Sequence, residues 1–166
     1  MAVLKVLQYP HPVLKTKAQK VVRITEAEQR LVRDMIETMY AENGVGLAAN
    51  QIGVLKQIFV ASADQVRGKE LVFFNAEIVK KEGVIKEFEG CLSVPEFYEP
   101  VRRAKKVWMK AMTLAGKVVE VKAEGLLSRI FQHETDHLDG ILFIDRLGFL
   151  KSKAAHKKLT KKAAHS

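Results

Sequence analysis

The chain has 166 residues, of which 48% are hydrophobic and 28% are charged, and its formal net charge is +9. This length suits one domain with one sizeable core, and the composition excludes an intrinsically disordered chain. Charged residues interrupt every long apolar stretch, and the N-terminal segment lacks a signal-peptide layout. We therefore expect one cytoplasmic domain over residues 1–166 with no membrane-spanning helix, and the positive charge makes an acidic partner worth considering.

The first part of the chain predicts an irregular segment followed by a helix. Two prolines disfavour regular helix within residues 1–24. Thr25 and Glu28 have the spacing of a capping box, and hydrophobic residues then recur at helical spacing. An Asn-Gly pair ends this pattern, so a helix is expected over about residues 25–42.

The middle of the chain predicts β-strands. After residues 44–53, which are rich in small side chains and are expected to form a loop, four stretches combine β-branched and aromatic residues with turn signals. These stretches occupy residues 57–62, 71–79, 83–96 and 105–125. We expect the third stretch to turn at Pro95 and the fourth to form a hairpin that turns at Ala115-Gly116.

Two further helices are predicted near the end of the chain. One covers about residues 126–139 and is followed by Gly140, which stands where a C-terminal cap glycine belongs. The other is basic and covers about residues 148–166. Strands in the middle of the chain, with helices on both sides, favour an α+β domain.

The helix expected at 126–139 carries ionisable residues on its apolar face. At about 100° per residue, His133 and His137 share a face with Ile130, and Glu134 lies beside them. The other side holds polar residues, namely Ser128, Arg129, Gln132, Thr135, Asp136 and Asp139. Two imidazoles and a carboxylate are costly to bury together without a shared purpose. The pattern H-E-x-x-H is the helix signature of zinc hydrolases, and a polar stretch of an ordinary helix is the alternative.

The H-E-x-x-H helix does not supply the third protein ligand that a catalytic metal of this kind takes. Phe143 occupies the position where metzincins have a third histidine, and Asp139 and Asp145 lie in no ligand motif. Cys91 would complete a His2Cys site, because a thiolate is a strong ligand for a borderline metal. The alternative for this lone cysteine is a small buried hydrophobic residue. Asp136, on the other side of the helix, is expected to form a structural ion pair.

Three motifs together resemble the signatures of bacterial peptide deformylases. GVGLAANQ at 44–51, EGCLSVPE at 89–96 and QHETDHLDG at 132–140 match the family patterns G-x-G-x-A-A-x-Q, E-G-C-x-S and Q-H-E-x-D-H in order and spacing. The resemblance covers nearly the whole chain and is closest to the compact bacterial class, type 1. It implies antiparallel β-sheets packed around a central helix that carries H-E-x-x-H, with an N-terminal helix and a basic C-terminal helix.

The same resemblance implies a reaction and a cofactor. The enzyme would remove the formyl group from the N-terminal formyl-methionine of newly synthesised proteins and release formate. Cys91, His133 and His137 would bind one divalent metal, Fe(II) in the cell and Zn, Ni or Co in preparations. Water or hydroxide on that metal would attack the formyl carbon, with Glu134 as general base and acid.

Further roles follow from the resemblance and from the residue types. The side-chain amide of Gln51 and the backbone N–H of Leu92 would stabilise the oxyanion. The substrate would lie against Val45, Gly46, Gly90, Leu92 and Ile130. Glu89 is expected to support the site from outside the ligand set, paired with Arg102 or Arg103. Three histidines without motif partners are expected at the surface, namely His11, His156 and His165.

The basic stretches at 101–110 and 151–166 leave other functions open. Clusters of Lys and Arg can neutralise phosphates, but the chain has no recognised DNA- or RNA-binding motif, so specific DNA binding is not expected. A basic binding protein with a structural H-E-x-x-H helix and a general metalloprotease are the alternatives. For the deformylase, the expected partners are nascent formylated polypeptides and, through the basic C-terminal helix, the ribosome.

Overall fold

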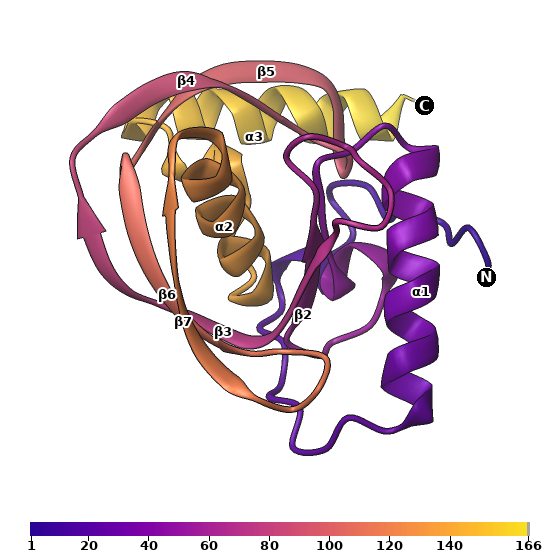
Figure 1. The fold of residues 1–166 in the computed structure, drawn as a ribbon. Helices are drawn as coiled ribbons and strands as arrows, with labels where there is room; N and C mark the ends of the chain where they lie inside the picture. Colours follow the sequence, from indigo (N-terminus) through magenta and orange to yellow (C-terminus); the bar gives the residue numbers. More distant parts are fainter. Residues whose placement is uncertain (166) are drawn as a thin grey trace.

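Three α-helices and two antiparallel sheets make up residues 1–165, the part of the chain that this computed structural model describes (Figure 1). The α-helices are α1 (Glu26–Ala41), α2 (Gly125–Leu138) and α3 (Phe149–Ala164). The strands are β1 (Gly46–Ala48), β2 (Ile58–Ala61), β3 (Leu71–Glu82), β4 (Ile85–Cys91), β5 (Val94–Arg103), β6 (Lys106–Met112) and β7 (Val118–Glu124). Short 3-10 helices are η1 (Pro12–Lys15), η2 (Ala49–Ile52) and η3 (Phe143–Arg146).

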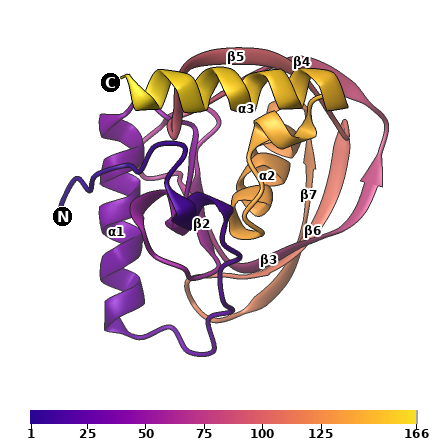
Figure 2. The same cartoon turned by 180° about the vertical axis from the view of Figure 1, so that it is seen from behind.

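The two sheets enclose α2. The larger sheet has the strand order β1-β2-β3-β6-β7, and the smaller one pairs β4 with β5. Figure 1 shows α2 inside the curve formed by β3, β6 and β7, with the β4–β5 ribbon and α3 across one end. The view from behind shows α1 on the side of β2 that faces away from α2 (Figure 2). The α+β class, with antiparallel sheets packed around a central helix, is therefore confirmed.

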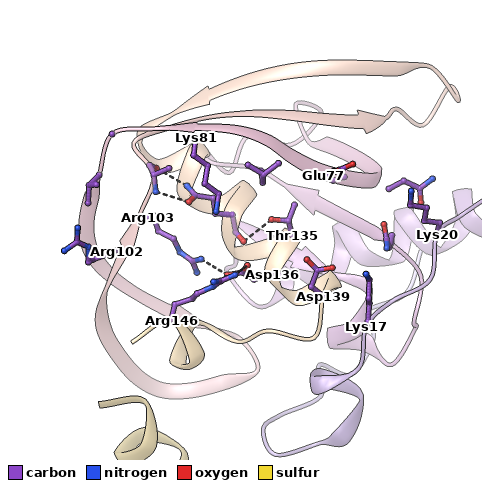
Figure 3. Close-up of a pocket in the computed structure, with 18 residues that line it drawn as sticks. Lys17, Lys20, Glu77, Lys81, Arg102, Arg103, Thr135, Asp136, Asp139 and Arg146 are labelled. Atoms are coloured by element: carbon purple, nitrogen blue, oxygen red, sulfur yellow. Dashed lines mark hydrogen bonds and ion pairs between the residues drawn. The ribbon is translucent and has the colours of Figure 1, made fainter. Parts of the chain in front are cut away.

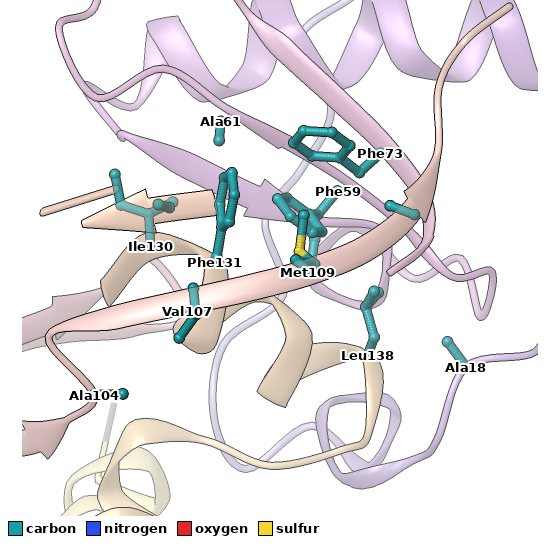
Figure 4. Packing of buried hydrophobic residues seen from close by; sticks show 13 residues of the cluster. Ala18, Phe59, Ala61, Phe73, Ala104, Val107, Met109, Ile130, Phe131 and Leu138 are labelled. Atoms are coloured by element: carbon teal, nitrogen blue, oxygen red, sulfur yellow. The ribbon is translucent and has the colours of Figure 1, made fainter. Parts of the chain in front are cut away.

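Aromatic packing fixes the inner side of α2. The rings of Phe59, Phe73 and Phe131, from β2, β3 and α2, contact one another (Figure 4). The ring centroids are 5.5 Å apart for Phe59 and Phe73, 5.9 Å for Phe59 and Phe131, and 5.4 Å for Phe73 and Phe131. Aromatic pairs of this kind contribute about 0.5–1.5 kcal/mol each beyond their buried area. This cluster therefore anchors α2 on the larger sheet just before the two histidines of the helix.

The polar side of α2 is buried as well, so little of the helix faces solvent. Ser128 and Gln132 bind the backbone of Ala104, which connects β5 to β6. Asp136 accepts hydrogen bonds from two arginines, as expected for a structural ion pair. These side chains are polar because buried backbone groups and charges require partners. Gly140 has a φ of 75°, which confirms the cap glycine after α2.

Residues 44–53 do not form the loop that their small side chains predicted. They form β1, in which Gly46 pairs with Ala61 of β2, and then η2. The fully buried residues in this stretch are Leu47, Ala48, Ala49 and Asn50. The small side chains are therefore required because this edge strand is closely packed. A flexible loop is also rich in small residues, so composition alone does not distinguish the two.

The turn expected at Pro95 lies earlier in the chain. Leu92 and Ser93 form it, and Cys91 pairs with Val94 across it. Pro95 lies within β5, where it is tolerated because β5 pairs with β4 alone among the strands of residues 1–165. This shift places Cys91 at the very end of a strand. The expected hairpin of β6 and β7 is confirmed.

The two ends of the chain meet beside α3. The Tyr9 hydroxyl lies 2.8 Å from His156 Nδ1, and His156 Nε2 lies 2.7 Å from a carboxylate oxygen of Asp145. His156, which was expected at the surface because it has no motif partner, is therefore only partly exposed and is held by two side chains. Its partner Tyr9 is 147 positions away, a separation that local sequence patterns cannot bridge.

The basic helix expected over 148–166 is present as α3, which ends at Ala164. Ser166 lies outside the described residues. Ala155 and Leu159 are buried and attach α3 to the rest of the fold. Within residues 1–165, no helix combines the length and apolar character needed to cross a membrane.

Candidate metal centre

Three potential metal ligands converge between β4 and α2. Cys91 stands at the end of β4, while His133 and His137 lie one helical turn apart on α2. The Sγ atom of Cys91 is 3.3 Å from Nε2 of His137, which is 3.2 Å from Nε2 of His133. All three ligand atoms lie within 4.8 Å of one another. The structure thus brings together the three residues that the sequence singled out as ligands.

A carboxylate fixes the orientation of the His133 ring. Nδ1 of His133 donates a hydrogen bond to Glu89 at 2.9 Å, which leaves Nε2 directed at the cluster. Glu89 is itself held by Arg103, at 2.8 and 2.9 Å, and not by Arg102. Histidine ligands of metals commonly have such a carboxylate on the other ring nitrogen. The support expected from Glu89 therefore has a definite contact in the structure.

The electrostatic environment of this group suits a cation. Burial opposes the charged form of His133, but hydrogen bonds to Cys91 and Glu89 outweigh it and raise the pKa of His133 well above its usual value. Burial, together with the neighbouring imidazole, lowers the pKa of His137 well below its usual value. A site that favours one positive charge and keeps an imidazole lone pair free, beside a thiol, fits a divalent metal ion.

Glu134 presents a buried carboxyl with an unused oxygen. Its Oε2 has no hydrogen-bond partner among the described residues, and burial raises the pKa of Glu134 to about 7. A Cβ atom at Gly46 would lie 2.6 Å from Oε1 of this carboxyl. The main chain of Gly46 and the carboxyl of Glu134 are therefore in close contact. A carboxyl with a pKa near neutrality can both accept and return a proton.

A cavity of about 760 Å³ opens over these groups. Its walls include every residue that the sequence assigned to catalysis or substrate contact, namely Val45, Gly46, Gln51, Gly90, Leu92, Ile130 and Glu134. The sequence did not indicate Phe88 and Tyr98, which are 68% and 67% exposed at the cavity, or Arg129, which donates to the Phe88 carbonyl. A register shift between Glu89 and Cys91 distorts β4, so both of its faces contribute.

Gln51 is held in place beside the thiol. Its Oε1 accepts from the backbone N–H of Ala48 at 3.0 Å, which turns its amide nitrogen toward Cys91 Sγ, at 3.6 Å, and Ser93 Oγ, at 3.1 Å. Leu92, in the turn next to Cys91, lines the same cavity. Ser93 is a further contact of the site that its position in the E-G-C-x-S pattern could have indicated.

A second cavity, of about 740 Å³, opens on a different face of α2 (Figure 3). Arg103 and Arg146 converge there on Asp136, at 2.6 and 2.8 Å. Asp139 is exposed at the end of the helix, and Asp145 pairs with Lys15 at 2.9 Å. Neither Asp139 nor Asp145 belongs to the group of potential ligands found among the described residues.

Comparison with known proteins identifies the family. The model of the polypeptide deformylase family matches residues 3–153. A peptide deformylase from Thermodesulfovibrio yellowstonii is 44% identical over 98% of this chain and 99% of its own length. The crystal structure of a peptide deformylase from Legionella pneumophila has a TM-score of 0.91 at 43% identity and covers 98% of this chain and 96% of that chain.

A peptide deformylase from Ehrlichia chaffeensis in complex with actinonin has a TM-score of 0.88 at 36% identity, with 98% of each chain covered. The likeness therefore extends over sequence and fold together, and over nearly the full length of each relative. The chain belongs to the polypeptide deformylase family, metal-dependent hydrolases that remove the formyl group from the N-terminal formyl-methionine of newly synthesised proteins.

Proposed function

We propose that Cys91, His133 and His137 bind one divalent metal ion and that residues 1–166 form a single catalytic domain around it. The observation that carries this proposal is the convergence of three ligand atoms within 4.8 Å, beside a cavity that Cys91, His133 and the buried Glu134 line. A general metalloprotease and a basic binding protein do not need this combination.

One thiolate and two imidazoles suit several divalent metals. From the family, we expect Fe(II) to fill the site in the cell and Zn, Ni or Co to replace it in preparations. Such an ion supplies Lewis acidity and an activated water at neutral pH. The hydrogen bond from His133 to Glu89 supports the assignment, because it leaves Nε2 as the ligand atom.

Glu134 moves the proton in the proposed mechanism. With a pKa of about 7, it takes a proton from the attacking water and returns it to the departing amine. Gln51 and the backbone N–H of Leu92 donate hydrogen bonds to the oxyanion that forms at the formyl carbon. One well-placed donor of this kind is worth about 3–4 kcal/mol. The fixed orientation of the Gln51 amide supports this role.

The substrate lies in the cavity of about 760 Å³. Val45, Leu92 and Ile130 supply apolar surface for the methionine side chain, while Gly46 and Gly90 leave room for the peptide backbone.

Nascent chains emerge from the ribosome, and the basic surface of α3 is the part of the molecule proposed to dock there. We therefore propose a cytoplasmic location for the enzyme.

The decisive test is formate release from a formyl-Met-Ala-Ser peptide by protein purified without oxygen. We expect release to stop when a chelator removes the metal and to return when Fe(II), Co(II) or Ni(II) is added. Glu134→Gln should retain the metal and lose about 100- to 10,000-fold in kcat. Actinonin should inhibit, because the Ehrlichia chaffeensis relative binds it. Folded protein that binds a divalent metal but releases no formate would contradict the proposal.

A further inference from the structure

A buried arginine links the metal centre to the far face of α2. Arg103 is the last residue of β5 and is 6% exposed. Its Nε and Nη2 atoms bind the two carboxylate oxygens of Glu89 at 2.8 and 2.9 Å, and its Nη1 binds Asp136 at 2.6 Å. Glu89 in turn accepts a hydrogen bond from His133 Nδ1. One guanidinium group therefore holds two carboxylates at once.

These contacts close a loop through both elements that carry potential ligands. Glu89 precedes Cys91 by two residues on β4, and Asp136 follows His133 by three residues on α2. Because Arg103 binds both carboxylates, it ties the end of the strand with the thiol to the helix with the imidazoles. Any shift of β4 relative to α2 would have to break at least one arm of this clamp.

The burial of these charges indicates a role other than stability. The side chains of Arg103, Glu89 and Asp136 are 4%, 6% and 11% exposed. Buried ion pairs are often no more stabilising than hydrophobic residues of similar volume, because the loss of hydration offsets the attraction between the charges. The geometry that this network imposes on its neighbours is therefore the better explanation for its presence.

We propose that Arg103 is a positioning residue for the metal centre, acting through Glu89 on His133 and through Asp136 on α2. With both oxygens of Glu89 clamped, the His133 ring has one favourable orientation, in which Nε2 faces Cys91 and His137. The proposal rests on the metal site proposed above. Arg146 also binds Asp136 (Figure 3). Among the described residues it forms no hydrogen bond or ion pair with Glu89 or His133, so it provides a natural comparison.

Metal affinity provides a test that does not depend on turnover. Arg103→Met removes the charge and the donors but keeps a long side chain. Metal-free protein would be titrated with Co(II) against a chromogenic chelator, and the visible spectrum of bound Co(II) would be recorded. We expect Arg103→Met to bind Co(II) about 10- to 100-fold more weakly, as for other residues that orient metal ligands, and with an altered spectrum. Arg102→Met, at the exposed neighbouring position, and Arg146→Met should retain the original affinity and spectrum.

Arg103→Lys provides a second variant that keeps the positive charge. An ammonium group cannot engage two carboxylates through a planar fork, so we expect a smaller but measurable loss of Co(II) affinity. If Arg103→Met does not fold, Arg103→Lys decides: weaker Co(II) binding at unchanged stability of the metal-free protein supports the proposal.

The proposal would be overturned if a folded Arg103 variant kept the original Co(II) affinity and spectrum and lost only stability. Arg103 would then be part of a purely structural ion pair. Failure of the metal site itself would look different. In that case the unaltered protein would not bind Co(II), or Cys91→Ser would bind it equally well.

Discussion

At the scale of single residues, the contact between Gly46 and Glu134 shows how tightly main chain and carboxyl are fitted. The φ angle of Gly46 is not in the left-handed region, so its backbone would allow other residues. The restriction comes from outside, because a Cβ atom would lie 2.6 Å from Oε1 of Glu134. Gly46 also pairs with Ala61, so β1 cannot move aside without losing its place in the sheet.

Gly46→Ala should therefore disable catalysis without unfolding the protein. The added methyl group displaces the Glu134 carboxyl, and misplacement of a reacting group by about 1 Å can cost about 100-fold in rate. Formate release would be measured beside metal content, which should stay the same. Gly148→Ala is the matched control, because a Cβ atom there meets nothing within 4 Å. Equal activity of the two variants would show that Glu134 does not need its present position.

At the scale of elements, the first turn of α1 contains an acidic side chain, Glu28, whose pKa is changed by folding. The backbone N–H and the hydroxyl of Thr25 both donate to the carboxylate of Glu28, which also pairs with Lys56. Hydrogen bonds from Lys56 and Thr25 lower the pKa of Glu28 from 4.5 to about 2. A group with a lowered pKa in the folded state stabilises the protein above its ordinary pKa. That contribution is lost as the pH falls from 4.5 toward 2.

Glu28→Gln should therefore destabilise the protein at neutral pH and matter progressively less in acid. The free energy of unfolding in urea would be compared between the variant and the unaltered chain from about pH 7 to about pH 3. We expect the difference to be largest at neutral pH and to shrink below about pH 4.5. Glu26→Gln, at an exposed site in the same turn, controls for the loss of one carboxylate. A pH-independent difference would contradict the linkage.

The outer side of α3 presents lysines that no carboxylate neutralises. Lys153, Lys157 and Lys161 are exposed at intervals of four residues and form no ion pair within the described residues. Replacing all three with Gln should weaken co-sedimentation with ribosomes at low salt, because phosphate contacts by Lys make binding salt-dependent. Deformylase activity should not change. The same replacement at the exposed Lys69, Lys86 and Lys117 removes equal charge elsewhere, and equal loss from both triple variants would refute docking through α3.

At the scale of the whole molecule, sequence patterns predicted the elements whose signals are local. Helical periodicity and the capping box placed α1, and the spacing of His133 and His137 placed both imidazoles on one face of α2. Patterns could not reveal that the polar side of α2 is also buried, because β5 and β6 cover it only in the folded chain. The choice of Arg103 over Arg102 as the partner of Glu89 likewise depends on the register between β4 and β5.

Metal removal should affect stability as well as activity, because the proposed ligands come from separate elements. A ligand that binds only the folded state stabilises it by about 4 kcal/mol when its concentration is about 1,000 times Kd. We expect a chelator to lower the Tm of the unaltered protein, measured by circular dichroism. It should leave the Tm of Cys91→Ser nearly unchanged, because that variant lacks one proposed ligand. Equal effects of the chelator on both proteins would exclude Cys91 from the metal site.

The hydrogen bond between Tyr9 and His156 has a consequence for the order of synthesis. The two residues are 147 positions apart. At about 5–20 residues per second, a ribosome adds His156 about 7 to 30 s after Tyr9. For that period the N-terminal segment leaves the ribosome without its final partner. The contact that joins the N-terminal segment to α3 therefore cannot form until His156 itself has been synthesised.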